Sequence, residues 1–205
     1  MSELTRAVGI IIEHCLGARP GEDALVIADE GTRTIGEALR QAAAERGSDA
    51  VLAIMDERVT DGTEPPASIA AALATCDLYI AATTRSLSHT MARKRATGAG
   101  VRGATMPSVT PEMLARAMAV DFERMAARSN AIAELLTGGK AARVTCPLGT
   151  EATFDLTGRT GIPDDGNLRD PGAFGNLPCG EAFIAPPGWR GADRRVELRA
   201  TRSLG

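Results

Sequence analysis

The sequence has few aromatic residues and only two histidines, which limits the sites that it can form. Aromatic residues make up 3% of its 205 residues, with one Trp and one Tyr, so stacking platforms for single-stranded nucleic acid have little material. Two histidines exclude a metal site built from several histidines of this chain. A net charge of -3 gives no general basic field. We therefore expect no nucleic-acid partner.

Several catalytic and cofactor motifs are also absent. The sequence has no Gly-x-x-x-x-Gly-Lys-Ser/Thr phosphate loop, no Gly-x-Ser-x-Gly nucleophile elbow and no His-Glu-x-x-His zinc helix. The segment Asp29–Thr32 follows the first predicted strand in place of a Gly-x-Gly-x-x-Gly turn, which argues against a dinucleotide site there.

Compartment and redox state follow from two further absences. None of the four cysteines forms a Cys-x-x-Cys pair, and a chain of this length without a signal favours reduced thiols. Apolar runs fall well short of the roughly 18 to 20 residues that a membrane helix needs. The N-terminus lacks a charged leader followed by an apolar stretch. We expect a cytoplasmic protein without a membrane partner.

Alternating strand and helix patterns occupy the first 137 residues. Four apolar runs have the length of buried strands: 24–28, 49–55, 77–81 and 102–106. Six stretches carry helix patterns or start signals: 3–17, 33–46, 66–75, 89–98, from Thr110 onward, and 120–137. Strands that alternate with helices predict an α/β fold, with a parallel sheet of about four strands flanked by helices.

The pattern changes at Gly138-Gly139. Residues 142–146 and 152–156 flank a Pro-Leu-Gly-Thr connection, which predicts a hairpin. Residues 158–180 are rich in Gly, Pro, Asp and Asn and are predicted to be loop, and 181–185 to be one short strand. We predict an α/β domain over 1–137, a small incomplete β-rich segment over 138–186 and an Arg-rich tail over 187–205. Unpaired strand edges in the second segment favour a homodimer.

Two stretches are open to either a ligand-binding or a purely structural interpretation. Asp29 and Thr84 lie where predicted parallel strands end, which is where such sheets bind ligands, but both residue types also cap helices. Ser88, His89 and Thr90 begin a predicted helix whose N-terminus suits an anion, which makes them candidate substrate-binding residues. The alternative is that Ser88 only caps this helix and His89 lies half exposed.

A third candidate is the Glu of a stiff turn. Pro178 and Gly180 bracket a tight turn that places Glu181 at the start of a strand. A carboxylate on rigid backbone suits a divalent metal ligand or a general base. The spacing is equally typical of a surface Glu after a turn, so the pattern leaves both interpretations open.

Four segments together resemble the aminopeptidase T family of metallo-aminopeptidases, which also includes the iron-dependent 2,5-dihydroxypyridine 5,6-dioxygenases. The segments are Glu64-Pro65-Pro66, Thr83–Thr90, Thr105-Met106-Pro107 and the turn Asn176-Leu-Pro-Cys-Gly-Glu181 with Ala182–Pro186. The resemblance extends from residue 1 to about 186, and the Asn-Leu-Pro-x-Gly-Glu turn is its most specific part. It implies that Glu181 is a metal ligand and that Zn, Co or Fe is the metal. The implied substrate is a peptide or a small aromatic compound.

The last residues depart from the family pattern. Family members continue well beyond the Glu181 turn and supply another Glu, a His and a late His-x-Asp as the remaining ligands. This sequence instead continues with five arginines and two acidic residues after Ala185. The departure suggests a C-terminally truncated product with an out-of-frame end, and we expect metal not to bind tightly and the isolated chain to be inactive or nearly so.

Three functions are therefore open on the sequence alone. The first is hydrolysis of N-terminal residues from peptides by a metal-dependent aminopeptidase impaired by truncation. The second is iron-dependent cleavage of an aromatic ring. The third is a non-catalytic α/β remnant that acts as a binding or dimerisation module. The ligands that would distinguish the first two do not occur in this sequence as the family pattern places them.

Overall fold

The computed structural model describes residues 2–149 and 151–185, which form two compact units. The first unit contains Met1–Phe122 and Gly166–Cys179, and the second contains Glu123–Asp165 and the chain from Gly180 onward. The domain boundaries at 138 and 187 remain a prediction, and the Arg-rich tail lies outside the described residues. None of the described helices is long and apolar enough to cross a membrane.

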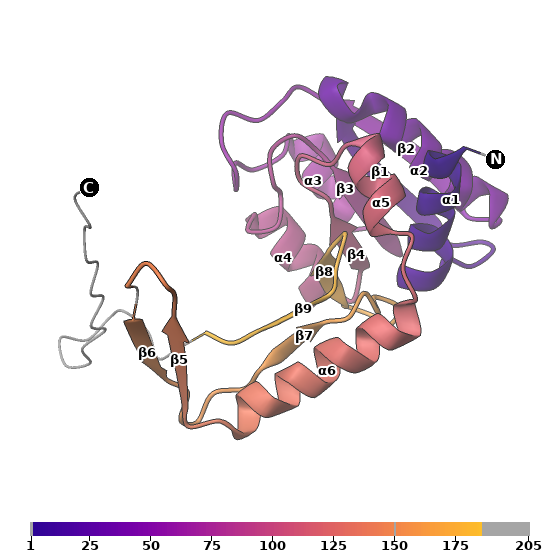
Figure 1. Cartoon of the computed structure of the whole chain (residues 1–205). Coiled ribbons are helices and arrows are strands. Elements are labelled where there is room, and N and C mark those ends of the chain that lie inside the picture. The colour runs from indigo at the N-terminus through magenta and orange to yellow at the C-terminus, as the bar shows by residue number, and fades with distance from the viewer. Residues whose placement is uncertain (1, 150, 186–205) are drawn as a thin grey trace. The chain divides into compact units, whose positions relative to one another are not determined.

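The first unit is built on a parallel sheet of five strands, which confirms the predicted α/β class (Figure 1). The strand order is β2-β1-β3-β4-β8, and every neighbouring pair is parallel. The strands are β1 (Asp23–Asp29), β2 (Asp49–Met55), β3 (Leu78–Ala82), β4 (Arg102–Thr105) and β8 (Phe174–Asn176).

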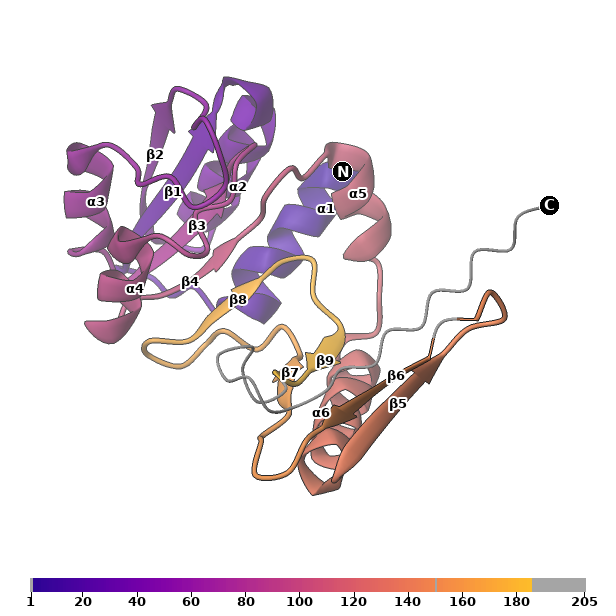
Figure 2. The same cartoon turned by 90° about the vertical axis from the view of Figure 1, so that its left-hand side faces the viewer.

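Helices cover both faces of this sheet, as the apolar runs of the strands require. One face packs on α1 (Glu3–Ile10), its π-helical continuation Ile11–Cys15, α2 (Arg33–Glu45) and α5 (Pro111–Ala117). The other face packs on α3 (Ala67–Leu73) and α4 (Met91–Gly98) (Figures 1 and 2). A one-turn 3-10 helix, Glu30–Thr32, follows β1.

The second unit combines one long helix with two small antiparallel sheets. Its elements are α6 (Phe122–Gly138, whose first residue belongs to the first unit), β5 (Ala141–Thr145), β6 (Glu151–Asp155), β7 (Ile162–Asp164) and β9 (Glu181–Phe183). β5 pairs with β6 in the predicted hairpin, visible as a two-stranded ribbon in Figure 2. β7 pairs with β9, so Asp164 lies directly opposite Glu181.

Two elements differ from the sequence-based expectation. Residues 158–180 were expected to be loop, yet they contain β7 and β8. β8 has only three residues and no strand-like hydrophobic pattern, because its backbone bonds to the edge of β4 rather than a buried side-chain run hold it in place. The helix expected from residue 89 begins at Met91, with Thr90 rather than Ser88 as its cap.

Candidate functional site

Asp29 and Thr84 come together at the carboxyl ends of β1 and β3. These strands are neighbours whose chains continue to opposite sides of the sheet, the position where open α/β sheets bind ligands. The Asp29 carboxylate is 1% exposed and accepts hydrogen bonds from Thr84 N at 2.6 Å, Thr84 Oγ1 at 2.9 Å and Thr32 Oγ1 at 3.1 Å. Asp29 is thus occupied by the protein's own donors, which favours the structural interpretation.

The loop between β2 and α3 is tied to the loop after β3. Glu57 lies 3.2 Å from the Arg85 guanidinium, and Asp61 accepts a hydrogen bond from Ser86 N at 2.8 Å. The Glu64 carboxylate accepts hydrogen bonds from the backbone N–H groups of Met91 and Ala92. A carboxylate of the chain itself therefore fills the place where the N-terminus of α4 would attract an external anion.

The three predicted substrate-binding residues have different surroundings. Ser88 and Thr90 are 4% and 1% exposed, whereas His89 is exposed. The Thr90 hydroxyl donates to Leu87 O and accepts from Arg93 N, so it belongs to the start of α4. Of the three, His89 presents its side chain to solvent, and its contact with substrate stays a prediction.

Ser88 also belongs to a polar network that the sequence reasoning did not assemble. Its hydroxyl lies 2.7 Å from Thr105 Oγ1 and donates to Asn176 Oδ1 at 3.0 Å, while Thr105 Oγ1 donates to the same Oδ1 at 2.6 Å. Ser86 Oγ donates to Ser88 Oγ at 2.8 Å. The signal was present, since Ser88, Thr105 and Asn176 each lie in a segment that carries the family resemblance, but no spacing rule joins them.

Glu181 is exposed on β9, and the half-buried carboxyl of Asp164 lies opposite it on β7. Burial, together with the negative charges of Glu181 and Asp165, raises the pKa of Asp164 to about 6. Gly180 adopts a φ of 122°, which favours glycine, and its N–H donates to Asp164 O at 2.9 Å. The turn therefore places two carboxyl groups at one position of a short sheet.

Two facing carboxyl groups do not complete a divalent metal centre. Protein sites for zinc or iron use three or more side-chain donors, and the residues that the structure describes contain no group of three His, Cys, Asp or Glu placed to hold an ion. The described residues thus do not fit a resident metal. Glu181 as a ligand remains a proposal from the family resemblance.

Metal retention gives a direct test of this interpretation. After incubation with Zn²⁺, Co²⁺ or Fe²⁺ and gel filtration in metal-free buffer, we expect the protein to retain much less than one equivalent, because two half-exposed oxygen donors bind weakly. Plasma mass spectrometry of the eluted protein measures this. One full equivalent of metal in the wild type, lost in Glu181→Gln, would contradict the expectation.

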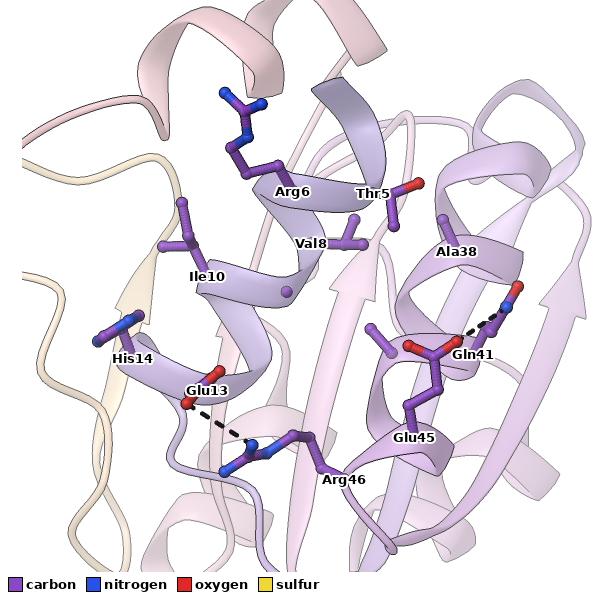
Figure 3. A pocket seen from close by; sticks show the side chains of 12 residues that line it. Thr5, Arg6, Val8, Ile10, Glu13, His14, Ala38, Gln41, Glu45 and Arg46 are labelled. Carbon is purple, nitrogen blue, oxygen red and sulfur yellow. Dashed lines mark hydrogen bonds and ion pairs between the residues drawn. The ribbon is translucent and has the colours of Figure 1, made fainter. Parts of the chain in front are cut away.

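A groove of about 350 Å³ lies between the first helix and α2, on the helical face of the first unit (Figure 3). Several of its polar side chains are already paired: Glu13 with Arg46 at 3.6 Å, and Gln41 with Glu45 at 3.0 Å. His14 stacks on Phe122 with ring centroids 6.5 Å apart. None of the predicted site residues lines this groove, and its polar contacts are of the kind that hold two surface helices together.

The family assignment comes from comparison with known sequences and structures. A sequence model of the 2,5-dihydroxypyridine 5,6-dioxygenase family, NicX, matches residues 11–193. No curated protein matches the chain.

Two solved structures share the fold. One is 2,5-dihydroxypyridine dioxygenase from Pseudomonas putida KT2440, with a TM-score of 0.72, 18% identity, and coverage of 91% of this chain and 57% of that one. The other is wild-type AmpT from Thermus thermophilus, with a TM-score of 0.58, 17% identity, and coverage of 90% and 61%. The chain thus spans about three fifths of the length of each. It belongs to the 2,5-dihydroxypyridine 5,6-dioxygenase family, whose fold it shares with AmpT.

Proposed function

We propose that the protein serves the oxygen-dependent opening of a small hydroxylated pyridine ring. The match of the dioxygenase family model to residues 11–193 carries this proposal. It places ring cleavage ahead of peptide hydrolysis, the function that the sequence reasoning preferred. The structural likeness to AmpT keeps the aminopeptidase as the second candidate.

The chain's own residues have limited roles in this proposal. Glu181 contributes one carboxylate ligand to the metal, and the segment Ser88–Thr90 contacts the substrate through His89. Iron, when bound, supplies the reaction with molecular oxygen. Because the described residues do not complete a metal centre, we expect turnover to need ferrous iron in large excess over protein.

Oxygen uptake tests the proposal. Purified protein with 2,5-dihydroxypyridine and excess ferrous iron should consume oxygen above the rate of the same mixture without protein, and Glu181→Gln should reduce that rate toward the background. Release of a chromophore from an aminoacyl-p-nitroanilide with cobalt or zinc, without oxygen uptake, would establish the aminopeptidase instead. Absence of both activities would favour the non-catalytic binding module.

A further inference from the structure

The amide group of Asn176 is held in one orientation by its neighbours. Its Oδ1 accepts two hydrogen bonds, from Ser88 Oγ at 3.0 Å and from Thr105 Oγ1 at 2.6 Å. Rotating the amide by 180° would place an NH₂ group against both hydroxyls, and each hydroxyl hydrogen would need a new acceptor. The network therefore selects the orientation in which the oxygen points inward.

The two N–H bonds of Asn176 Nδ2 consequently point away from the network. Asn176 is an exposed residue at the carboxyl end of β8, the last strand of the sheet. Among the residues that the structure describes, its Nδ2 has no hydrogen-bond acceptor. Two solvent-facing donors are therefore available at the edge where parallel sheets bind their ligands.

The hydroxyls behind Asn176 are themselves held firmly. Ser88 and Thr105 are 4% and 1% exposed. Ser86, which donates to Ser88, is clamped by the β2–α3 loop, because its N–H donates to Asp61 Oδ1 at 2.8 Å and its carbonyl accepts from Gly62 N at 2.8 Å. Thr105 and Asn176 are register partners in β4 and β8. The outward donor thus rests on a rigid, buried support, as a preorganised binding group requires.

We propose that Asn176 Nδ2 donates a hydrogen bond to a carbonyl-type oxygen of a small planar aromatic ligand. This inference rests on the proposed function and names the group of the substrate that is recognised. A 2-hydroxypyridine ring exists largely as the 2-pyridone, whose carbonyl oxygen is a stronger acceptor than a neutral ring hydroxyl. Asn176 therefore reads the oxygen at position 2 of the ring, not the hydroxyl at position 5.

Asn176→Asp separates this binding role from a structural one. The substitution keeps an inward oxygen for Ser88 and Thr105 but replaces the outward donor with a negatively charged acceptor. We expect the unfolding temperature to change by no more than about 2 °C. The Kd for 2,5-dihydroxypyridine, measured by calorimetry without oxygen or metal, should rise at least about tenfold, since a donor is lost and a like-charged acceptor is gained.

Thr105→Val serves as the matched control. It removes one buried hydroxyl but leaves the outward amide donors, so the unfolding temperature should fall while the Kd changes less than in Asn176→Asp. 2-Hydroxypyridine should show the same loss of affinity in Asn176→Asp as the full substrate. 3-Hydroxypyridine, which lacks the oxygen at position 2, should be insensitive to the substitution.

The outcomes separate this inference from the proposed function. A wild type that binds the pyridones and an Asn176→Asp variant that does not would support it, whether or not oxygen uptake is found. Equal Kd values in the two proteins, or no binding of the pyridones by the wild type, would overturn it even if the wild type consumed oxygen.

Discussion

Arg102→Met is expected to lower the free energy of unfolding by about 3–5 kcal/mol, the range for breaking a buried ion pair by removing one partner. Arg102 is 6% exposed, and its Nη2 lies 2.6 Å from the Glu22 carboxylate. The same guanidinium donates to Leu16 O at 2.9 Å and Gly17 O at 3.3 Å. Removing it would leave one carboxylate and two backbone carbonyls without their donor.

The loss should depend on pH because of Glu22. Burial raises the pKa of Glu22, but hydrogen bonds from Arg102 and from the Arg19 N–H outweigh burial and hold it below its ordinary value of 4.5. A lowered pKa in the folded state contributes stability above pH 4.5 that is lost as the pH falls through the folded-state value. The wild type should therefore lose most of its advantage over Arg102→Met on strong acidification.

Urea denaturation at pH 7 and at a pH well below 4.5 measures both effects. The matched control is Arg46→Met, because Arg46 is half exposed and pairs with Glu13 at 3.6 Å; it should cost less than about 1 kcal/mol. Equal losses in the two variants at pH 7 would mean that the Arg102 pair contributes no more than a surface pair.

Gly103→Ala is expected to destabilise the first unit by more than about 3 kcal/mol, at the upper end for overpacking. A Cβ atom at Gly103 would lie 2.3–2.6 Å from three ring atoms of Tyr79, which is 1% exposed on the neighbouring strand β3. Both residues lie within the sheet, so neither backbone can shift without disturbing the pairing of β3 and β4. Thermal unfolding should show the loss as a much lower transition temperature.

Two further variants test this cause. Gly98→Ala adds a methyl group in α4, where nothing lies within 4 Å, and should be neutral or stabilising by up to about 1 kcal/mol. Tyr79→Leu combined with Gly103→Ala should be less destabilised than the sum of the two single variants, because the smaller side chain relieves the contact. Strict additivity would contradict the steric explanation.

Predictability from sequence differed between the two parts of the site. Glu181 was singled out because Pro178 and Gly180 mark a turn within a short stretch of chain. Its partner was not, because Asp164 lies 17 positions away in a stretch that reads as loop, and only the β7–β9 register places the two opposite each other. Asn176 carried no local signal of its role, since its partner hydroxyls lie 88 and 71 positions away.

The amino-acid sequence by itself determined the alternation of strands and helices in the first unit and the β5–β6 hairpin. These follow from periodicity and turn residues, which act over a few neighbouring positions. Only the tertiary structure decided that Asp29 is filled by Thr84, that Glu64 covers the start of α4 and that Asn176 presents its amide outward. Each of these depends on hydrogen bonds between residues far apart in the chain, and such pairings exist only once the sheet has brought the strand ends together.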